Sequence, residues 1–221
     1  MQNKGMIFFH RGLHGNGVPE NSIPSFENAI DAGVGIELDV RLSRDGEPVV
    51  FHDKTLRRMC GDKRKVSELT VNELKGLRLK DSDETIPTLE EVLELTGGRV
   101  PLMIETKPPK HRLFDRKLER SMLPLLKAYK GTYYLQSFDK DGMKYMKKRL
   151  PDTLCGILSG NFYAEPKGFD FINYKLSELT PEKVSQLRKT YSIVMAWSTG
   201  ESDLEKSTAA MERLKLDGIV A

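Results

Sequence analysis

Two acidic residues, Glu37 and Asp39, stand in an otherwise apolar and β-branched run. In a strand, residues i and i+2 point to the same face and lie about 7 Å apart. Two carboxylates at that distance repel each other by roughly 2 kcal/mol at an effective dielectric constant near 20. A bound divalent cation would remove this repulsion, so the pair is a candidate set of metal ligands. The alternative is a strand with two solvated acids, which the apolar character of the run argues against.

The chain turns back after this run and brings a histidine to the same level. Residues Ser43–Gly46 carry an Asp-Gly step between two apolar segments, which is a strong signal for a β-hairpin. The returning leg, Pro48–Phe51, ends at His52. We therefore expect His52 to lie near the end of the strand that contains Asp39. One hairpin would then place an acid pair and an imidazole in one neighbourhood.

Strand-like apolar segments alternate with amphipathic helical segments along the whole chain. The predicted core strands are residues 6–9, 35–40, 100–104, 132–135, 154–158, 169–173, 193–197 and 217–220. Such β/α alternations imply a parallel sheet, and eight strands close into a barrel. An open doubly wound sheet is the alternative.

The domain organisation expected from this pattern is a single catalytic domain over residues 1–221, with a barrel core at about 6–220. A small insert at about 54–87 is rich in charge and is predicted to hold one short helix, at residues 70–74. Thr70 opens that helix with a capping box, and Thr88 opens the next one in the same way. Ser22 is the predicted N-cap of the first helix.

The composition is that of an ordinary globular enzyme, with 38% hydrophobic and 30% charged residues in 221. A formal charge of +3, without a basic block interleaved with aromatic residues, argues against a nucleic-acid partner. No run is long enough for a transmembrane segment, and the first residues lack the pattern of a signal peptide. Cys60 and Cys155 are interpreted as reduced thiols, with a disulfide left open. Together these features predict a cytoplasmic location.

Polar residues of chemical interest gather at the ends of the predicted strands. In a parallel barrel, catalytic residues come from the C-terminal ends of several strands. This convergence is stronger evidence for a site than any single residue. The residues so placed are His10, Arg11, Glu37, Asp39, Glu105, Lys107, Gln136 and Trp197, with His52 on the returning hairpin leg.

The residue types narrow the chemistry. Three carboxylates without histidine or cysteine between them form a hard oxygen site, which suits Mg²⁺ or Ca²⁺ rather than zinc. Arg11 and Lys107 are cations of the kind that hold a phosphate oxygen. His10 and His52 can act as base and acid. This combination points to metal-assisted phosphoryl chemistry on a small-molecule substrate.

Each of these residues also has a purely structural interpretation. Arg11 could clamp a carboxylate, and Lys107 could pair with a neighbouring acid. Glu20 and Asn21 could organise the start of the first helix, and for Asn21 this is the favoured interpretation. Trp197 could fill the core.

The ordered motifs HRG, PENS, IELDV, DGEPVVFHD and IETK resemble those of the glycerophosphodiester phosphodiesterase family, and LQSF and MAWST are similar to that family too. The resemblance runs from His10 to Val220. It implies a (β/α)8 TIM barrel of the phospholipase-C-like phosphodiesterase type. It also implies that one divalent cation, Mg²⁺ or Ca²⁺, supports hydrolysis of glycerophosphodiesters to sn-glycerol 3-phosphate and an alcohol.

The same resemblance implies a role for each matching residue. The roles are metal binding for Glu37, Asp39 and Glu105, acid/base catalysis for His10 and His52, phosphate binding for Arg11 and Lys107, an active-site acid of open role for Glu20, and a wall at the glycerol end for Trp197.

One departure from the family concerns the last strand. The family usually continues with a Thr-Asp-x-Pro loop and often a closing helix, whereas this sequence ends at Val220 and Ala221 with no clear eighth helix. One side of the barrel would then be exposed or covered by a partner, so a homo-oligomer is one of the expected states.

Three other functions are alternatives to glycerophosphodiester hydrolysis. A sphingomyelinase-D-like or lysophospholipid phosphodiesterase would use the same polar site but need an apolar groove for an acyl chain. A non-catalytic binding barrel is disfavoured because the central polar residues are all present. A glycosidase is disfavoured because neighbouring cations would oppose the raised pKa that its acid needs.

Overall fold

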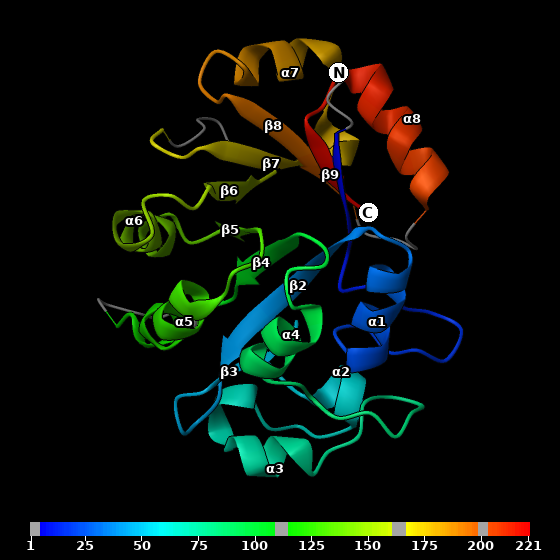
Figure 1. Cartoon of the computed structure of the whole chain (residues 1–221), viewed down its shortest axis with the longest axis vertical. Coiled ribbons are helices and arrows are strands. Elements are labelled where there is room, and N and C mark those ends of the chain that lie inside the picture. Colours follow the sequence, from blue (N-terminus) through cyan, green and yellow to red (C-terminus); the bar gives the residue numbers. More distant parts are fainter. Residues whose placement is uncertain (1–4, 109–114, 161–166, 199–202) are drawn as a thin grey trace.

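The computed structural model describes residues 5–108, 115–160, 167–198 and 203–221. Eight parallel strands in these ranges form a closed barrel, because β1 pairs with both β2 and β9 (Figure 1). This confirms the predicted (β/α)8 barrel over the open doubly wound sheet. The strands are β1 (Met6–Phe9), β2 (Gly35–Leu42), β4 (Leu102–Thr106), β5 (Tyr133–Ser137), β6 (Cys155–Ser159), β7 (Phe171–Lys175), β8 (Ile193–Trp197) and β9 (Gly218–Val220).

Six helices of the described ranges connect consecutive barrel strands and pack around the barrel (Figure 1). Ser22 caps the first of them, and Thr88 caps α4 with a complete capping box, as the sequence predicts. The helix before β5 begins at Lys117. The helices are α1 (Ile23–Asp31), α4 (Leu89–Thr96), α5 (Lys117–Ala128), α6 (Lys140–Arg149), α7 (Pro181–Leu187) and α8 (Leu204–Leu214).

Two apolar layers hold the barrel together. A large buried cluster fills the space between the strands and the outer helices. A smaller cluster lies at alternating positions of the barrel strands. It consists of Phe8, Met103, Phe171, Met195 and Val220. Side chains of a strand alternate between its faces, so these residues fill the barrel interior. The polar residues that follow them on the same strands must lie towards the C-terminal rim.

The hairpin after β2 returns along that strand. β3 (Pro48–Val50) pairs antiparallel with β2, with Val40 opposite Val50. The turn contains Gly46 at φ +93°, a conformation that L side chains rarely adopt. The Phe51 N–H then donates to the Asp39 carbonyl at 2.8 Å. The chain therefore returns to the level of Asp39 just before His52.

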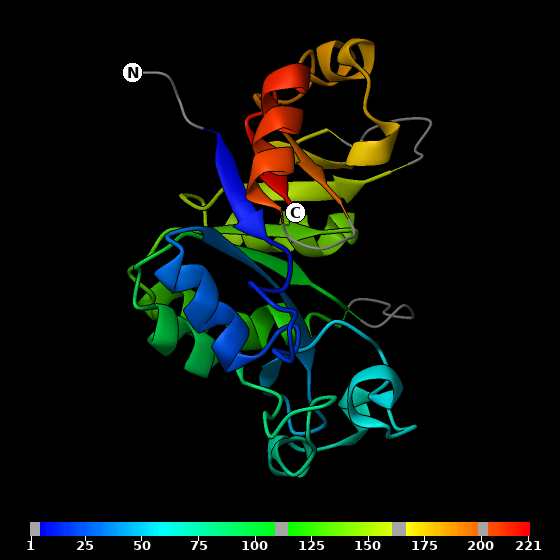
Figure 2. The same cartoon turned by 90° about the vertical axis from the view of Figure 1, so that its right-hand side faces the viewer.

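The segment after the hairpin has a small core of its own. It contains α2 (Arg57–Cys60), the 3-10 helix η1 (Val66–Glu68) and α3 (Val71–Lys75), and Figure 2 shows it projecting from one end of the barrel. The sequence predicted one short helix here, so that prediction is incomplete. α2 spans four residues, too few for a hydrophobic period to be seen. The core residues are Val49, Phe51, Leu56, Met59, Val66, Leu69, Leu74, Leu79 and Ile86.

None of the helices in the described ranges combines the length and the apolarity that a membrane crossing demands.

Candidate active site

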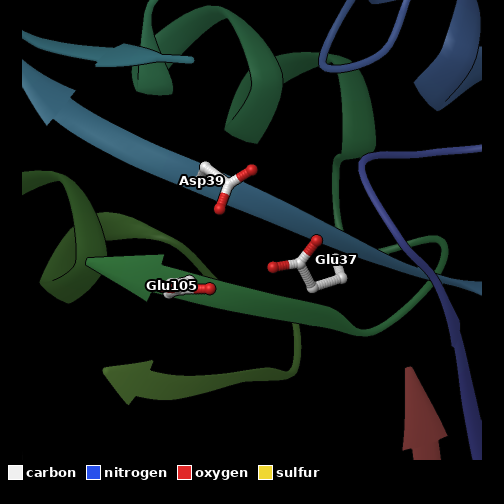
Figure 3. Close-up of side chains that lie close together, drawn as sticks. All are labelled: Glu37, Asp39 and Glu105. Carbon is white, nitrogen blue, oxygen red and sulfur yellow. The ribbon is translucent and has the colours of Figure 1, made fainter. Parts of the chain in front are cut away.

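Three carboxylates meet inside the C-terminal rim of the barrel. Glu37 and Asp39 come from β2 and Glu105 from β4, where Asp39 and Glu105 are register partners. One oxygen from each of the three lies within 4.8 Å of the others, and Figure 3 shows the side chains close together. All three are buried, with Glu105 the most exposed at 6%. The spacing of the two acids along β2 thus gives the shared face that the sequence predicts.

This cluster has the properties of a cation site. Its donor set consists only of carboxylate oxygens, which Mg²⁺ and Ca²⁺ prefer. Asp39 Oδ1 and Glu105 Oε1 are buried and accept no hydrogen bond among the described residues. Lys107 Nζ lies 3.2 Å from the first of these oxygens and 2.5 Å from the second, outside good hydrogen-bond geometry. Buried acceptors left in this state are costly, and a hard cation would satisfy them.

The three acids differ in pKa. Burial and then repulsion by Asp39 and Glu105 raise the pKa of Glu37 well above its ordinary value. Burial, opposed in part by Lys107, raises the pKa of Glu105 to about 7. Burial would also raise the pKa of Asp39, but Lys107 and the other nearby cations hold it below its usual range. Without a bound metal ion, Asp39 is therefore the most readily ionised of the three acids.

Arg11 lies directly against the cluster. Its backbone adopts φ +60°, a left-handed conformation that costs of order 1–3 kcal/mol in a non-glycine residue. In that conformation its N–H donates to Glu37 Oε2 at 3.0 Å. Its guanidinium donates to Glu20 Oε1 at 2.8 Å and lies 3.5 Å from Asp39 Oδ2. The carboxylate-clamping interpretation of Arg11 is thus observed, and the clamp holds the side chain beside the acids.

Asn21 belongs to the site, although the sequence favoured a role only at the start of the helix. Its side-chain N–H donates to Asp39 Oδ2 at 2.9 Å, and the residue is 2% exposed. Its backbone is also left-handed, at φ +53°, which asparagine tolerates better than most residues. The contact is tertiary, so the only local signal for it was an asparagine in a loop after a strand.

The two histidines lie on different segments near the rim. His10 follows β1, and its backbone N–H donates to the Ala221 carbonyl at 2.8 Å. Burial, and then the adjacent Arg11, lower the pKa of the His10 imidazole to about 4. Burial also lowers the pKa of His52, against the pull of Asp39. Both imidazoles are therefore neutral near pH 7 in the free protein.

His52 is fixed at its ring and at its backbone. The ring Nδ1 lies 2.7 Å from Asp53 Oδ1, a pairing that favours the proton on Nδ1. The carbonyl of His52 accepts from Arg41 Nε at 2.8 Å and Nη2 at 2.6 Å. Arg41 Nη1 also donates to the Lys107 carbonyl at 3.3 Å. Arg41 thus joins the hairpin to the end of β4, a role that the sequence did not reveal.

Trp197 ends β8, which stands opposite β4 in the strand order of the barrel. Its indole N–H donates to the Ser159 carbonyl at 3.1 Å, and its ring packs edge-to-face on Phe138 with centroids 6.3 Å apart. Phe138 is 50% exposed, whereas Trp197 is partly buried and also packs against the apolar cluster inside the barrel. Gln136 accepts a hydrogen bond from Asn173 at 2.8 Å and lies beside Glu105 in register.

Residues 10–220 match the model of the Glycerophosphoryl diester phosphodiesterase family. The chain belongs to this family. A glycerophosphodiester phosphodiesterase of Bacillus altitudinis is 30% identical over 96% of this chain and 92% of its own length. One from Caldanaerobacter subterraneus subsp. tengcongensis is 29% identical, over 98% and 93%. The family and the enzyme class that the motifs predicted are confirmed.

Solved structures of glycerophosphodiester phosphodiesterases share the fold. The Thermotoga maritima protein is 29% identical, with a TM-score of 0.76 over 98% of this chain and 93% of that one. An Oleispira antarctica phosphodiesterase in complex with sn-glycerol-3-phosphate is 24% identical, with a TM-score of 0.84 over 97% and 92%. At that lower identity the likeness concerns the fold alone.

The raised pKa values of Glu37 and Glu105 would make the binding of a cation by this cluster depend on pH. A group whose pKa is higher in the folded than in the unfolded state stabilises fully below its unfolded pKa, about 4.3 for glutamate. That contribution is lost as pH rises through the folded pKa, about 7 for Glu105. A bound cation offsets the loss because it binds the deprotonated carboxylates.

We therefore expect excess Mg²⁺ or Ca²⁺ to raise Tm more at about pH 8 than at about pH 6. Thermal denaturation with chelator and with cation at both pH values measures this difference. Equal shifts at the two pH values would contradict it.

Proposed function

We propose that the protein hydrolyses glycerophosphodiesters to sn-glycerol 3-phosphate and an alcohol, with one bound divalent cation, Mg²⁺ or Ca²⁺. The observation that carries this proposal is the buried cluster Glu37, Asp39 and Glu105 with Lys107 and Arg11 against it. The relatives named glycerophosphodiester phosphodiesterase, which are 29% and 30% identical over nearly the whole chain, support the same substrate class.

In this proposal, Glu37, Asp39 and Glu105 would hold the cation. When bound, the cation supplies Lewis-acid polarisation of the phosphoryl group and offsets negative charge that develops in the transition state. Arg11 and Lys107 share that charge as hydrogen-bond donors to the phosphate oxygens. Glu20 orients the Arg11 guanidinium through the 2.8 Å hydrogen bond between them. The phosphate is thus bound by groups that are already in place before the substrate arrives.

Two histidines transfer the protons. Because Asp53 favours the proton on Nδ1 of His52, the Nε2 atom of that ring can accept a proton from the attacking hydroxyl. His10 then protonates the leaving alkoxide. Its pKa of about 4 in the free protein rises when a negatively charged phosphate binds beside it. The attacking hydroxyl belongs either to water, which gives sn-glycerol 3-phosphate directly, or to the glycerol 2-hydroxyl. The second route first gives a cyclic phosphate, which water then opens with the roles of the two histidines exchanged.

Other predictions from the sequence stay predictions. They are a single catalytic domain over residues 1–221 with an insert at about 54–87, a cytoplasmic location, a homo-oligomer, and Trp197 as a wall at the glycerol end of the site.

The proposal is tested with a panel of glycerophosphodiesters that carry choline, ethanolamine, glycerol or inositol. We expect sn-glycerol 3-phosphate to be released, to stop when the cation is chelated, and to resume when Mg²⁺ or Ca²⁺ is restored. An enzymatic assay for glycerol 3-phosphate measures the release. Full activity in excess chelator, or release from no member of the panel, would refute the proposal.

A lysophospholipid phosphodiesterase is the second candidate, because the exposed Phe138 beside Trp197 offers apolar surface at the rim. Glycerophosphocholine and lysophosphatidylcholine share a headgroup and differ in the acyl chain. Comparison of kcat/KM for the two separates the candidates: we expect the glycerophosphodiester to be preferred.

A further inference from the structure

Arg58 joins two carboxylates that are distant in the sequence. It lies on α2 in the segment that follows the hairpin, and its side chain is 46% exposed. The guanidinium donates to both oxygens of Glu20, from Nη2 at 2.6 Å and Nη1 at 2.8 Å. It also donates to both oxygens of Asp53, from Nε at 2.7 Å and Nη2 at 3.2 Å. Paired contacts of this kind use the planar fork of arginine and fix the orientation of each carboxylate.

Each of these carboxylates in turn contacts a group of the active site. Glu20 accepts from Arg11 at 2.8 Å, and Asp53 lies 2.7 Å from His52 Nδ1. A continuous series of contacts therefore runs from the phosphate-binding guanidinium, through Arg58, to the proton-transferring imidazole.

We propose that Arg58 is a positioning residue: it holds Glu20 and Asp53 so that Arg11 and His52 keep their orientations for catalysis. The inference rests on the proposed function. It assigns a catalytic task to the segment after the hairpin, which otherwise packs around its own apolar core.

The helix that carries Arg58 is itself well held. Leu56 at the N-cap and Met59 within the helix are buried in the core of the segment, at 0% and 6% exposure. Gly61 caps the C-terminal end of the helix: its N–H donates to the Arg57 carbonyl at 3.1 Å, and its backbone is left-handed. A short, anchored helix can therefore present one side chain to the site in a fixed position.

Loss of Arg58 would affect the two carboxylates differently. Glu20 keeps Arg11 as a partner, whereas the described part of the chain leaves Asp53 with the His52 imidazole as its only other side-chain hydrogen-bond partner. Arg58 donates two hydrogen bonds to Asp53, so its removal leaves that carboxylate free to turn away from Nδ1. The proton of the imidazole is then no longer fixed on one nitrogen.

The other charged groups that act on His52 are Asp39, Lys107 and Arg11. They lie on β2, after β4 and after β1, and none of them contacts Arg58 in the described part of the chain. An Arg58 substitution therefore reaches His52 most directly through Asp53, and it reaches Arg11 through Glu20. Exposed ion pairs contribute little to stability, so a change in activity without a change in Tm is the expected signature.

The test compares Arg58→Met with Arg58→Lys and with Arg57→Met. Arg57 is the matched control because it is the preceding residue on α2 and its side chain is exposed. With cation and substrate saturating, we expect Arg58→Met to lower kcat about 10- to 100-fold with a smaller change in KM. Arg58→Lys should recover part of the loss, and Arg57→Met should match the wild-type protein.

Nitrogen NMR of the imidazoles gives a readout that a merely structural role would not move. We expect the Nδ1–H form of His52, assigned by its absence in His52→Ala, to be lost or exchange-averaged in Arg58→Met. Wild-type kcat and an unchanged His52 signal in Arg58→Met would overturn the inference, as would an equal loss in Arg57→Met. If the wild-type chain released no glycerol 3-phosphate, the proposed function would fail, whereas the NMR comparison would still decide whether Arg58 orients His52.

Discussion

Replacing His52 by alanine is expected to lower kcat for glycerophosphodiester hydrolysis about 10²- to 10⁴-fold, and His10→Ala by a similar factor. Both losses follow because each imidazole moves one proton in the transition state. Neither side chain is one of the three clustered carboxylates, so cation binding and Tm should stay close to wild-type values. Steady-state kinetics and thermal denaturation in saturating cation measure the two effects.

An activated leaving group separates the roles of the two histidines. The p-nitrophenyl ester of glycerol phosphate releases a stable phenolate that needs little protonation, so a missing general acid costs little on this substrate. We expect His10→Ala to regain most of its activity on it, whereas His52→Ala stays impaired. The reverse pattern would exchange the two roles. Near-normal turnover of the natural diester by either variant would refute its assignment.

The second large effect is expected from Glu37→Gln. The amide keeps an oxygen that can accept the 3.0 Å hydrogen bond from the Arg11 N–H, but the carboxylate charge is lost. We expect the affinity for Mg²⁺ or Ca²⁺ to fall at least 10²-fold, and kcat/KM at fixed cation to fall about 10³-fold, equivalent to about 4 kcal/mol. Calorimetric titration of the cation and steady-state kinetics measure the two quantities.

The same substitution should not destabilise the fold in chelator. Burial and repulsion from Asp39 and Glu105 act against the charged form of Glu37, so an uncharged residue relieves a cost. We expect Tm in chelator to be equal to or above the wild-type value, and Tm in excess cation to lie below it. Glu27→Gln is the matched control, because Glu27 is exposed on α1. A large loss of Tm in chelator would mean that Glu37 is a structural residue.

The features that the sequence predicted well depend on local pattern. Eight strand-like segments, most of them followed by a helical segment, predict a closed barrel because strands and helices differ in hydrophobic period. The acids of β2 share a face because the period of a strand is two residues, and the Asp-Gly turn returns His52 to them. Register with β4 then brings Glu105 beside Asp39.

The features that the sequence missed are contacts between segments without a common period. Arg58 lies on a helix of four residues, and its partners Glu20 and Asp53 come from two separate loops. Arg41 contacts backbone carbonyls, which every residue has, so its own identity gave no sign of its partners. Asn21 donates to Asp39 only because a left-handed backbone turns it towards β2. Long-range pairing of charged side chains requires the fold before it can be inferred.

The most direct measurement of the central claim is a parallel titration of Ca²⁺ or Mg²⁺ into the chelated protein, with heat of binding followed in one cell and glycerol 3-phosphate release in the other. We expect one ion per chain, and activity that recovers with the same midpoint as occupancy. Release at full rate before any ion binds, or an ion that still binds Glu37→Gln with wild-type affinity, would contradict the assignment of the three carboxylates to a catalytic cation.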